Sequence, residues 1–343
     1  MRHVLVTGGA GFIGSHFVKR IIKAEDVVRV TVLDALTYAG RIENLGTAFL
    51  SDKLRFVQGD VQDAAAVDEL MSSGPTAVVH FAAESHVDRS YGAADGFLST
   101  NVLGTQVLVR AAHRHGVEKF VHVSTDEVYG PLLRGEATEE APLRPTVPYA
   151  VSKAAGDLVA LGAHSTLGLP LCVTRSSNNY GPNQYPEKII PFFVTRLLRG
   201  MTVTLHDRGQ HVRNWLHVED NCAGIEAVLR KGEPGEVYNL GGGADLSCKE
   251  LTGYLLALCG ATWDAVGYIP DRPANDARYA IDWTKARDQL GYRPQHRLDD
   301  GLAETAEWYR RNVDRWAPLM TDSRTVVPAA RPARVPLELP RGH

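Results

Sequence analysis

Four side chains in the middle of the sequence are of the types that transfer protons. Asp126 and Glu127 follow closely on the apolar run 119–123, and Tyr149 and Lys153 stand four positions apart further along the chain. Two adjacent carboxyl groups can acquire different pKa values, so that one is a general acid and the other a general base. Tyrosine and lysine at this spacing share one face of a helix, and the ammonium would lower the pKa of the phenol. A base for an alcohol and a separate acid/base pair predict more than a simple alcohol oxidation.

A glycine-rich segment near the N-terminus has the spacing of a phosphate-binding loop. Gly9, Gly11 and Gly14 fit G-x-G-x-x-G, and Gly8, Gly11 and Gly14 fit G-x-x-G-x-x-G, between an apolar run and a helical pattern. Such glycines let the backbone approach a pyrophosphate at a helix N-terminus. Asp34 stands 20 residues after Gly14, where a carboxylate accepts hydrogen bonds from a ribose diol and repels a 2′-phosphate. The segment therefore predicts NAD rather than NADP; the alternative is a purely structural glycine turn.

The elements that must hold these residues alternate between strands and helices. Apolar runs predict strands at residues 3–7, 28–34, 54–58, 77–81, 119–123 and 171–174. Helical spacing is found at residues 13–23, 64–71, 100–115 and 149–163. This order is typical of an α/β, Rossmann-type doubly wound parallel sheet, in which ligands bind at the carboxyl ends of the strands. Asp60 and Val61 follow the third strand and would either meet the adenine or form an ordinary turn.

The sequence becomes less regular after about residue 176. The segment 178–191 predicts an ordered loop that leads to a helix near Ile189. Short strands are expected at 202–205 and 237–240, and helices at 247–258 and 302–312. We expect a NAD-binding Rossmann domain at 1–175, a smaller C-terminal α/β substrate-binding domain at 176–316, partly interleaved with the sheet, and a flexible C-terminal tail at 317–343.

Composition narrows the class of protein. The 343 residues are 44% hydrophobic and 22% charged with a net charge of −3, which is ordinary for a globular enzyme and gives no basic surface for nucleic acid. No apolar stretch approaches the ~20 residues that cross a bilayer, and the chain starts at once with a strand pattern, so we expect a soluble cytoplasmic protein without a membrane partner. The cysteines lack metal spacing, so we expect reduced thiols and no metal site.

Several segments together resemble the extended short-chain dehydrogenase/reductase superfamily and, within it, the dTDP-glucose 4,6-dehydratase family. The resemblance runs from Val4 to about Tyr309. It depends on TGGAGFIGSH (7–16), FAAESHVDRS (81–90), STDEVYG (124–130), PYAVSK (148–153), NNYGPNQYPEKIIP (178–191) and RYAID (278–282). The glycine loop and the Tyr-x-x-x-Lys pair mark only the superfamily. The Thr-Asp-Glu triplet and the segment 178–191 mark the dehydratase branch.

The resemblance implies that dTDP-glucose is dehydrated to a 4-keto-6-deoxy sugar for deoxysugar biosynthesis, in an internal redox cycle with NAD. Tyr149 would take the proton of the C4 hydroxyl as hydride leaves C4, while Lys153 lowers the pKa of Tyr149 and holds the ribose. Glu127 would remove the C5 proton that the new ketone has made acidic, and Asp126 would protonate the departing C6 hydroxyl. The hydride then returns to C6. Thr125 would hydrogen-bond the C4 oxygen.

Binding residues follow from the patterns and the resemblance together. For the cofactor they are Gly8, Gly11, Phe12, Ile13, Gly14, Asp34, Leu36, Thr37, Asp60, Val61, Phe81, Ala82, Ala83, Ser85, Thr100, Tyr149, Lys153 and Asn179. For the nucleotide sugar they are Ser85, Thr125, Asn178, Lys188, Ile189, Thr204, His206, Arg213, Asn239, Arg272 and Asn275. The lysine and the two arginines suit a pyrophosphate, which arginine can hold with two hydrogen bonds.

Two segments depart from the family pattern. Thr204-Leu205-His206 stands where the family usually carries Pro-aliphatic-Tyr, and Ala274-Asn275 stands where it usually carries Gly-His. Both segments contribute to nucleotide recognition in the family, so the identity of the base stays open.

Rival functions also stay open at the level of sequence. A nucleotide-sugar 4-epimerase or a nucleotide-uronate decarboxylase would need the tyrosine and lysine but not the pair Asp126 and Glu127. A non-catalytic NAD-binding regulator is a rival from another class. The resemblance also implies a homodimer that forms through the helices at 100–115 and 149–163.

Overall fold

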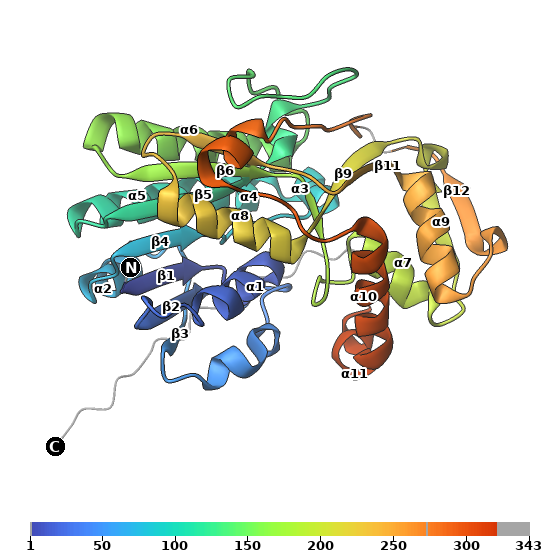
Figure 1. Ribbon diagram of the computed structural model, residues 1–343, viewed down its shortest axis with the longest axis horizontal. Helices are drawn as coiled ribbons and strands as arrows, with labels where there is room; N and C mark the ends of the chain where they lie inside the picture. Colours follow the sequence, from blue (N-terminus) through green and yellow to red (C-terminus); the bar gives the residue numbers. More distant parts are fainter. Residues whose placement is uncertain (1, 272–273, 321–343) are drawn as a thin grey trace.

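The structure, a computed structural model, describes residues 2–271 and 274–320. Its main sheet has seven strands in the order β10-β6-β5-β4-β1-β2-β3, and every neighbouring pair is parallel. These strands are β1 (His3–Thr7), β2 (Arg29–Asp34), β3 (Leu54–Gln58), β4 (Ala77–His80), β5 (Lys119–Thr125), β6 (Leu171–Ser176) and β10 (Val237–Leu240). The predicted Rossmann-type sheet is confirmed (Figure 1).

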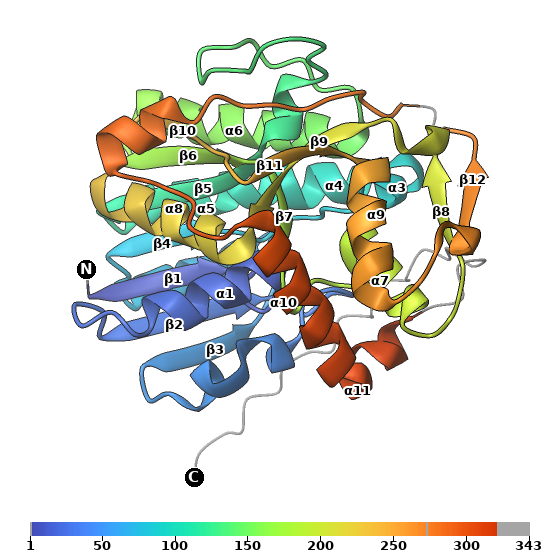
Figure 2. The ribbon, with the colours of Figure 1, turned by 45° about the vertical axis from the view of Figure 1, so that its right-hand side comes forward.

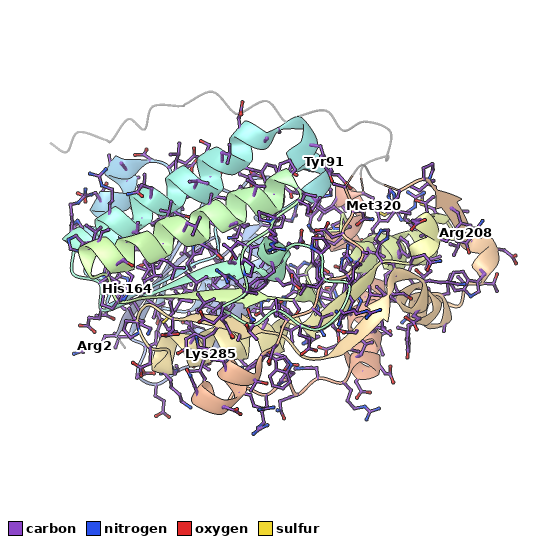
Figure 3. All side chains as sticks on the ribbon, turned by 90° about the horizontal axis from the view of Figure 1, so that it is seen from above. Arg2, Tyr91, His164, Arg208, Lys285 and Met320 are labelled. Carbon is purple, nitrogen blue, oxygen red and sulfur yellow. The ribbon has the colours of Figure 1, made fainter. Side chains whose placement is uncertain are left out.

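Helices cover both faces of this sheet and bury a separate apolar core on each. One face carries α1 (Phe12–Ile21) and α8 (Val218–Lys231), and the other carries α2 (Ala64–Ser72), α5 (Thr105–Arg114) and α6 (Pro148–Leu167). Along β1, Val4 and Val6 belong to the first core and Leu5 to the second. A strand that is buried on both faces consists of a nearly continuous apolar run, which is why the sequence predicted such strands well. Figure 3 shows α5 (teal) and α6 (green) side by side on the second of these faces.

Short helices connect these elements. They are η1 (Ile42–Leu50), α3 (Val87–Gly92), α4 (Ala94–Leu98), η2 (Ser99–Gly104) and η3 (Asp126–Tyr129). The predicted helix at 100–115 is an α-helix only from Thr105, because η2 is a π-helix, an uncommon form that sequence periodicity does not reveal.

The second half of the chain builds a smaller lobe beside the carboxyl ends of the strands (Figure 2). Its strands are β7 (Asn178–Tyr180), β8 (Val203–His206), β9 (Val212–His217), β11 (Ala244–Ser247) and β12 (Val266–Ile269), which form the sheets β11-β9-β7 and β12-β8. Its helices are α7 (Ile189–Leu197), α9 (Cys248–Cys259), α10 (Leu298–Arg311), α11 (Val313–Trp316) and the short turns η4 (Asp207–Gly209), η5 (Trp263–Ala265) and η7 (Ala317–Leu319). The short π-helix η6 (Ala286–Leu290) packs instead against α8 and β10 of the larger lobe, where Ala286 and Leu290 belong to the first core. A third apolar core lies between α7, α9 and α10.

The chain crosses between the two lobes more than once. After β9 it returns to the main sheet as α8 and β10, then leaves again through β11. The expected tail begins later than 317, because η7 is helical and Ala317 and Met320 pack against the third core; residues 321–343 lie outside the described part. Within the described part, no helix has both the length and the apolar character that a membrane span requires.

Candidate active site

A cavity of about 990 Å³ extends from the glycine loop along the carboxyl ends of the strands into the smaller lobe. It brings together predicted cofactor and substrate residues from Gly8 to Asn275, which are 267 positions apart in sequence. Besides the residues treated below, its lining includes Phe12, Ile13, Thr37, Asp60, Val61, Phe81, Ala82, Ala83, Thr100, Ile189 and Thr204.

The glycine loop approaches neighbouring backbone too closely for any side chain. Gly8 has φ 69°, and a Cβ there would lie 2.6 Å from the backbone nitrogen of Ala82. A Cβ on Gly14 would lie 2.2 Å from the carbonyl oxygen of Gly8. Gly11 is the N-cap of α1, whose N-terminus therefore opens on the cavity with its free N–H groups. This is a cradle for a pyrophosphate.

Asp34 ends β2 at the far side of the glycine loop. Its Oδ2 accepts a hydrogen bond from the backbone N–H of Ala10 (2.8 Å) and its Oδ1 accepts one from that of Leu36 (2.9 Å). The carboxylate lines the cavity and keeps lone pairs for a ribose diol. Leu36 itself does not line the cavity, in contrast to the prediction. Its backbone adopts a φ of 50°, and its N–H is the donor to Asp34. The loop and Asp34 together fit the two ends of an NAD dinucleotide.

The carboxyl pair stands where β5 ends and η3 begins. Thr125 is the N-cap of η3, and its hydroxyl accepts a hydrogen bond of 3.3 Å from the N–H of Glu127. Thr125 and Glu127 line the cavity. Asp126 is 2% exposed and does not line it, and its Oδ2 has no hydrogen-bond partner within the described chain. Burial, and then the charge of Glu127, raise the pKa of Asp126 to about 8. Asp126 therefore holds its proton at neutral pH.

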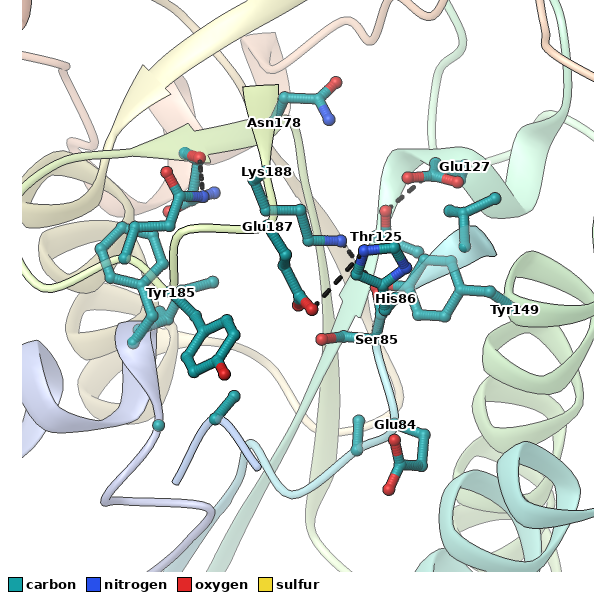
Figure 4. Close-up of a pocket in the computed structure, with 18 of the residues that line it drawn as sticks. Glu84, Ser85, His86, Thr125, Glu127, Tyr149, Asn178, Tyr185, Glu187 and Lys188 are labelled. Atoms are coloured by element: carbon teal, nitrogen blue, oxygen red, sulfur yellow. Dashed lines mark hydrogen bonds and ion pairs between the residues drawn. The ribbon is translucent and has the colours of Figure 1, made fainter. Parts of the chain in front are cut away.

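Tyr149 and Lys153 lie one turn apart at the start of α6 and line the cavity. Figure 4 shows Tyr149 on the same side of the cavity as Thr125 and Glu127. Lys153 is 5% exposed, and its Nζ donates a 2.7 Å hydrogen bond to the carbonyl of Val123. Burial lowers the pKa of Lys153 to about 8. Burial, and then the charge of Glu127, raise the pKa of Tyr149 above 10.0, while a hydrogen bond with Thr125 lowers it. The expected lowering of the Tyr149 pKa is thus wrong for the protein without ligands, because burial and the charges of the neighbouring carboxylates raise it.

Basic and polar side chains line the opposite end of the cavity. Lys188 Nζ donates a hydrogen bond to the carbonyl of Ser85 (2.8 Å). The guanidinium of Arg213 donates to Oδ1 of Asn275 (3.1 Å) and lies over the Tyr279 ring, 4.5 Å from its centroid. These residues line the cavity, as does His206, whereas Arg272 lies outside the described residues.

Three predicted asparagines have different positions. Asn178 and Asn179 line the cavity, and the Oδ1 of each is buried without a hydrogen-bond partner in the described chain. Asn239 does not line the cavity, and its assignment to the substrate stays a prediction. It is fully buried, its Oδ1 accepts from the Tyr129 hydroxyl (2.8 Å), and its Nδ2 donates to the carbonyls of Ala137 (2.9 Å) and Asp282.

The sequence interpretation missed a polar cluster in the middle of the cavity. Glu187 accepts a 2.8 Å hydrogen bond from the Tyr38 hydroxyl, and its Oε2 lies 3.5 Å from Nε2 of His86. Burial raises the pKa of Glu187. Figure 4 shows Glu187 and Lys188 across the cavity from Thr125 and Tyr149. The sequence did contain a signal for Glu187, because this residue stands next to the predicted Lys188 in the segment 178–191.

Among the described residues, potential metal ligands meet at two places, which the sequence did not indicate. One is formed by His217, His296 and Glu304 and the other by Asp207, His211 and Asp271. In the first, Nδ1 of His217 accepts from a backbone N–H, which puts the ring proton on Nε2, and the His296 ring stacks on it at 4.0 Å and 24°. Nearly parallel rings do not point their lone pairs at one ion. In the second, His211 Nε2 already has a partner, since it lies 3.0 Å from Oδ2 of Asp271. We assign no metal to either group.

Comparison with known proteins agrees with this geometry. The sequence model of the family described as GDP-mannose 4,6 dehydratase matches residues 5–305. A dTDP-glucose 4,6-dehydratase of Streptomyces niveus is 51% identical over 92% of this chain and 95% of its own length, and one of Streptomyces griseus is 53% identical over 93% and 97%. The crystal structure of DesIV, a dTDP-glucose 4,6-dehydratase from Streptomyces venezuelae with NAD bound, superposes with a TM-score of 0.91 at 51% identity and covers 93% of this chain and 100% of that one. The chain therefore belongs to the GDP-mannose 4,6 dehydratase family and is similar throughout its length to the dTDP-glucose 4,6-dehydratases.

Proposed function

We propose that the protein is an NAD-dependent dTDP-glucose 4,6-dehydratase that forms the 4-keto-6-deoxy sugar for deoxysugar biosynthesis. The observation that carries this proposal is the pair at the end of β5: Asp126 is a buried acid with a pKa of about 8, and Glu127 beside it lines the cavity. A 4-epimerase or a uronate decarboxylase needs no such pair. Relatives more than half identical to this chain bear the name of the same activity.

The first half-reaction requires a base at the C4 hydroxyl, and we assign this role to Tyr149. The hydrogen bond between Thr125 and Tyr149 favours the phenolate. A charged Lys153, one turn along α6, would favour it as well. NAD+, held by the glycine loop and Asp34, would supply a further positive charge and the hydride chemistry at C4 and C6. Thr125 also lies in reach of the cavity to hold the C4 oxygen.

The second half-reaction is a loss of water, and we assign it to the carboxyl pair. The C4 ketone acidifies the C5–H bond, so Glu127 can remove that proton as general base. Asp126 gives its own proton to the C6 hydroxyl, which leaves as water. The two roles are opposite, and the geometry separates them: Asp126 is buried and protonated, whereas Glu127 borders the cavity.

The remaining cavity residues would hold the nucleotide sugar. Lys188 and Arg213 supply positive charge for the diphosphate, and Asn275 orients the guanidinium of Arg213 through a 3.1 Å hydrogen bond. His206 would face the base from β8. The nicotinamide end of the cofactor would lie near Asn179, with Ser85 between cofactor and sugar.

A homodimer, a cytoplasmic location and a division into two domains complete the proposal. Exposed Leu98, Leu103, Val151 and Leu158 lie on α4, η2 and α6, on the face that would pair with a second copy. All four cysteines are free, which fits a reducing compartment. The domain division follows the two lobes, with α8 and β10 assigned to the NAD-binding one.

One experiment tests the reaction against its rivals. The protein is incubated with dTDP-glucose in deuterated water, and the sugar is analysed by NMR and mass spectrometry. A 4-keto-6-deoxy product with deuterium at C5 is expected, because solvent must supply the proton that replaces the one Glu127 removed. An unlabelled C4 epimer would identify an epimerase, and unchanged dTDP-glucose would refute the proposal. A substrate deuterated at C4 should give a product with that deuterium at C6.

A further inference from the structure

The segment 181–188 borders the cavity and is neither helix nor strand. It connects β7 to α7 and carries Glu187 and Lys188, which line the cavity. At its turn, Asn183 has φ 68°, a left-handed conformation that costs a residue with a side chain free energy and persists only where neighbouring contacts hold it. The position of Lys188, which we assign to the diphosphate, therefore depends on the groups that hold this turn.

The two carbonyl groups that flank Asn183 accept hydrogen bonds from helices outside the segment. Nε2 of His16, in α1, donates to the carbonyl of Pro182 (2.9 Å). The hydroxyl of Tyr309, in α10, donates to the carbonyl of Gln184. α1 starts at the glycine loop, and α10 belongs to the smaller lobe. One side of the turn is thus bonded to the helix of the cofactor site and the other side to the smaller lobe.

His16 is buried, and both of its ring nitrogens face hydrogen-bond acceptors. The residue is 6% exposed, and its Nδ1 lies 2.5 Å from Oε1 of Glu219 in the first turn of α8. Burial raises the pKa of Glu219, but the hydrogen bond with His16 lowers it and the net shift is downward, so this side chain is a carboxylate. A carboxylate and a carbonyl only accept hydrogen bonds. His16 therefore makes both bonds as an imidazolium, with a proton on each nitrogen.

The packing of α1 against α8 does not depend on this ion pair. The two helices meet in the first apolar core, to which Phe17 and Val18 of α1 and Cys222 and Ile225 of α8 belong. A partly buried ion pair adds little to such a contact, because the cost of taking charges out of water offsets their attraction. The bond from Nε2 is different, since it reaches a segment that has no regular structure to hold it.

We propose that His16 is a positioning residue that holds the segment 181–188 against the helix of the glycine loop and thereby places Lys188 for the diphosphate of the substrate. Glu219 orients the ring through Nδ1, so that Nε2 points at Pro182. The inference rests on the proposed function, because it takes this part of the cavity to hold a nucleotide sugar. Loss of the Nε2 bond should weaken binding of the nucleotide and leave NAD binding, which depends on the glycine loop, unchanged.

Two amide variants test the two ring nitrogens separately. In His16→Gln the amide nitrogen can take the place of Nε2 and keep the bond to Pro182, whereas the shorter amide of His16→Asn can take the place of Nδ1 only. The side chain of Glu219 is 39% exposed, so water can replace the bond that His16→Gln gives up. Calorimetry with dTDP and the NAD-bound protein should show nearly wild-type affinity for His16→Gln and at least about tenfold weaker binding for His16→Asn.

A matched control comes from the other end of the first strand. His3 is 8% exposed and its Nε2 lies 2.9 Å from Oγ1 of Thr31, so it is a buried, hydrogen-bonded histidine at the start of β1. His3→Asn should leave the affinity for dTDP unchanged. The affinity for NAD, measured by fluorescence titration, should stay at the wild-type value in all three variants.

Kinetics and NMR provide two further measurements. The KM for dTDP-glucose should rise in His16→Asn by a factor similar to the loss of dTDP affinity, while kcat changes much less. In ¹⁵N spectra of the wild type at about pH 6, the His16 ring, assigned by its absence in His16→Gln, should show two protonated nitrogens.

Three results would overturn the inference: wild-type dTDP affinity in folded His16→Asn, equal losses in the two amide variants, or an unprotonated Nε2 in the wild-type spectrum. If His16→Asn does not fold, the wild-type spectrum decides alone. If dTDP binding changes as expected while the enzyme never converts dTDP-glucose, the proposed function fails and the role of His16 stands.

Discussion

The raised pKa of Asp126 predicts the pH range in which the enzyme can expel water. With a pKa of about 8, roughly nine in ten molecules carry the Asp126 proton at pH 7, and roughly one in ten does so at pH 9. At the ordinary value of 3.8, only about one molecule in 1,600 would be protonated at pH 7. Burial of this one carboxyl therefore increases the population of the working acid by about a thousandfold.

The elimination step should follow that protonated fraction. In single turnovers with dTDP-glucose, the rate of water loss is expected to be constant below about pH 8 and to fall about tenfold per pH unit above it. Asp126→Asn should lower this rate by about 10²–10⁴-fold and remove the alkaline limb. Reduction of the nicotinamide, measured in the same mixture, should change much less in that variant, because Asp126 takes no part in oxidation at C4.

A substrate analogue separates Asp126 from Lys153, which also titrates near about 8. The dTDP-glucose analogue with fluorine at C6 loses fluoride, a leaving group that needs no proton. Asp126→Asn should therefore process this analogue almost as fast as the wild type does. If the variant is as slow with the fluoro analogue as with dTDP-glucose, or if its alkaline limb persists with dTDP-glucose, Asp126 is not the acid.

Three further changes test other parts of the site. Glu127→Gln should retain NAD and reduce it with dTDP-glucose, yet give no deuterium at C5; turnover equal to the wild type would contradict the role of Glu127 as base. Gly14→Ala should abolish NAD binding, measured by fluorescence titration, because its Cβ would lie 2.2 Å from the Gly8 carbonyl, and wild-type affinity would show that the loop can move. Asp126→Asn should be more stable than the wild type by an amount that grows from about pH 4 to about pH 8. Over this range the folded wild type retains the Asp126 proton that the unfolded chain has lost, so its free energy of unfolding falls as pH rises, by at most about 6 kcal/mol. Denaturant titrations in which the free energy of unfolding has the same pH dependence in both proteins would exclude this.

The sequence predicted best the strands of the main sheet. β1, β3 and β10 have the predicted bounds. β1 is buried along its length, as a strand covered on both faces must be. β3 and β10 are the edge strands, and β3 is only partly buried. β9, β11 and β12 were missed, since they are short, partly exposed and paired with segments far away in sequence. The helix α8 was missed although Val218, Cys222 and Ile225 recur at helical spacing, because its other residues are polar.

The positions of the site residues were easier to predict than their protonation states and their burial. Asp34 and Glu127 follow strands of a parallel sheet, so the topology alone directs them to the same edge. The protonation of Tyr149 and the burial of Asn239 depend instead on side chains that come together only in the folded chain. A sequence motif does not reveal how strongly a side chain will be desolvated, so the expected direction of the Tyr149 pKa shift was wrong.

The two proton transfers make opposite demands on one buried cavity wall. Burial raises the pKa of Asp126, which the elimination needs, and the same burial raises the pKa of Tyr149, which opposes the oxidation. Positive charge must therefore be concentrated at Tyr149 alone, and Lys153 can provide it only below about pH 8. Above that pH Lys153 loses its charge and Asp126 its proton, so both half-reactions should fail over the same range. Burial thus sets a single alkaline boundary for the whole reaction.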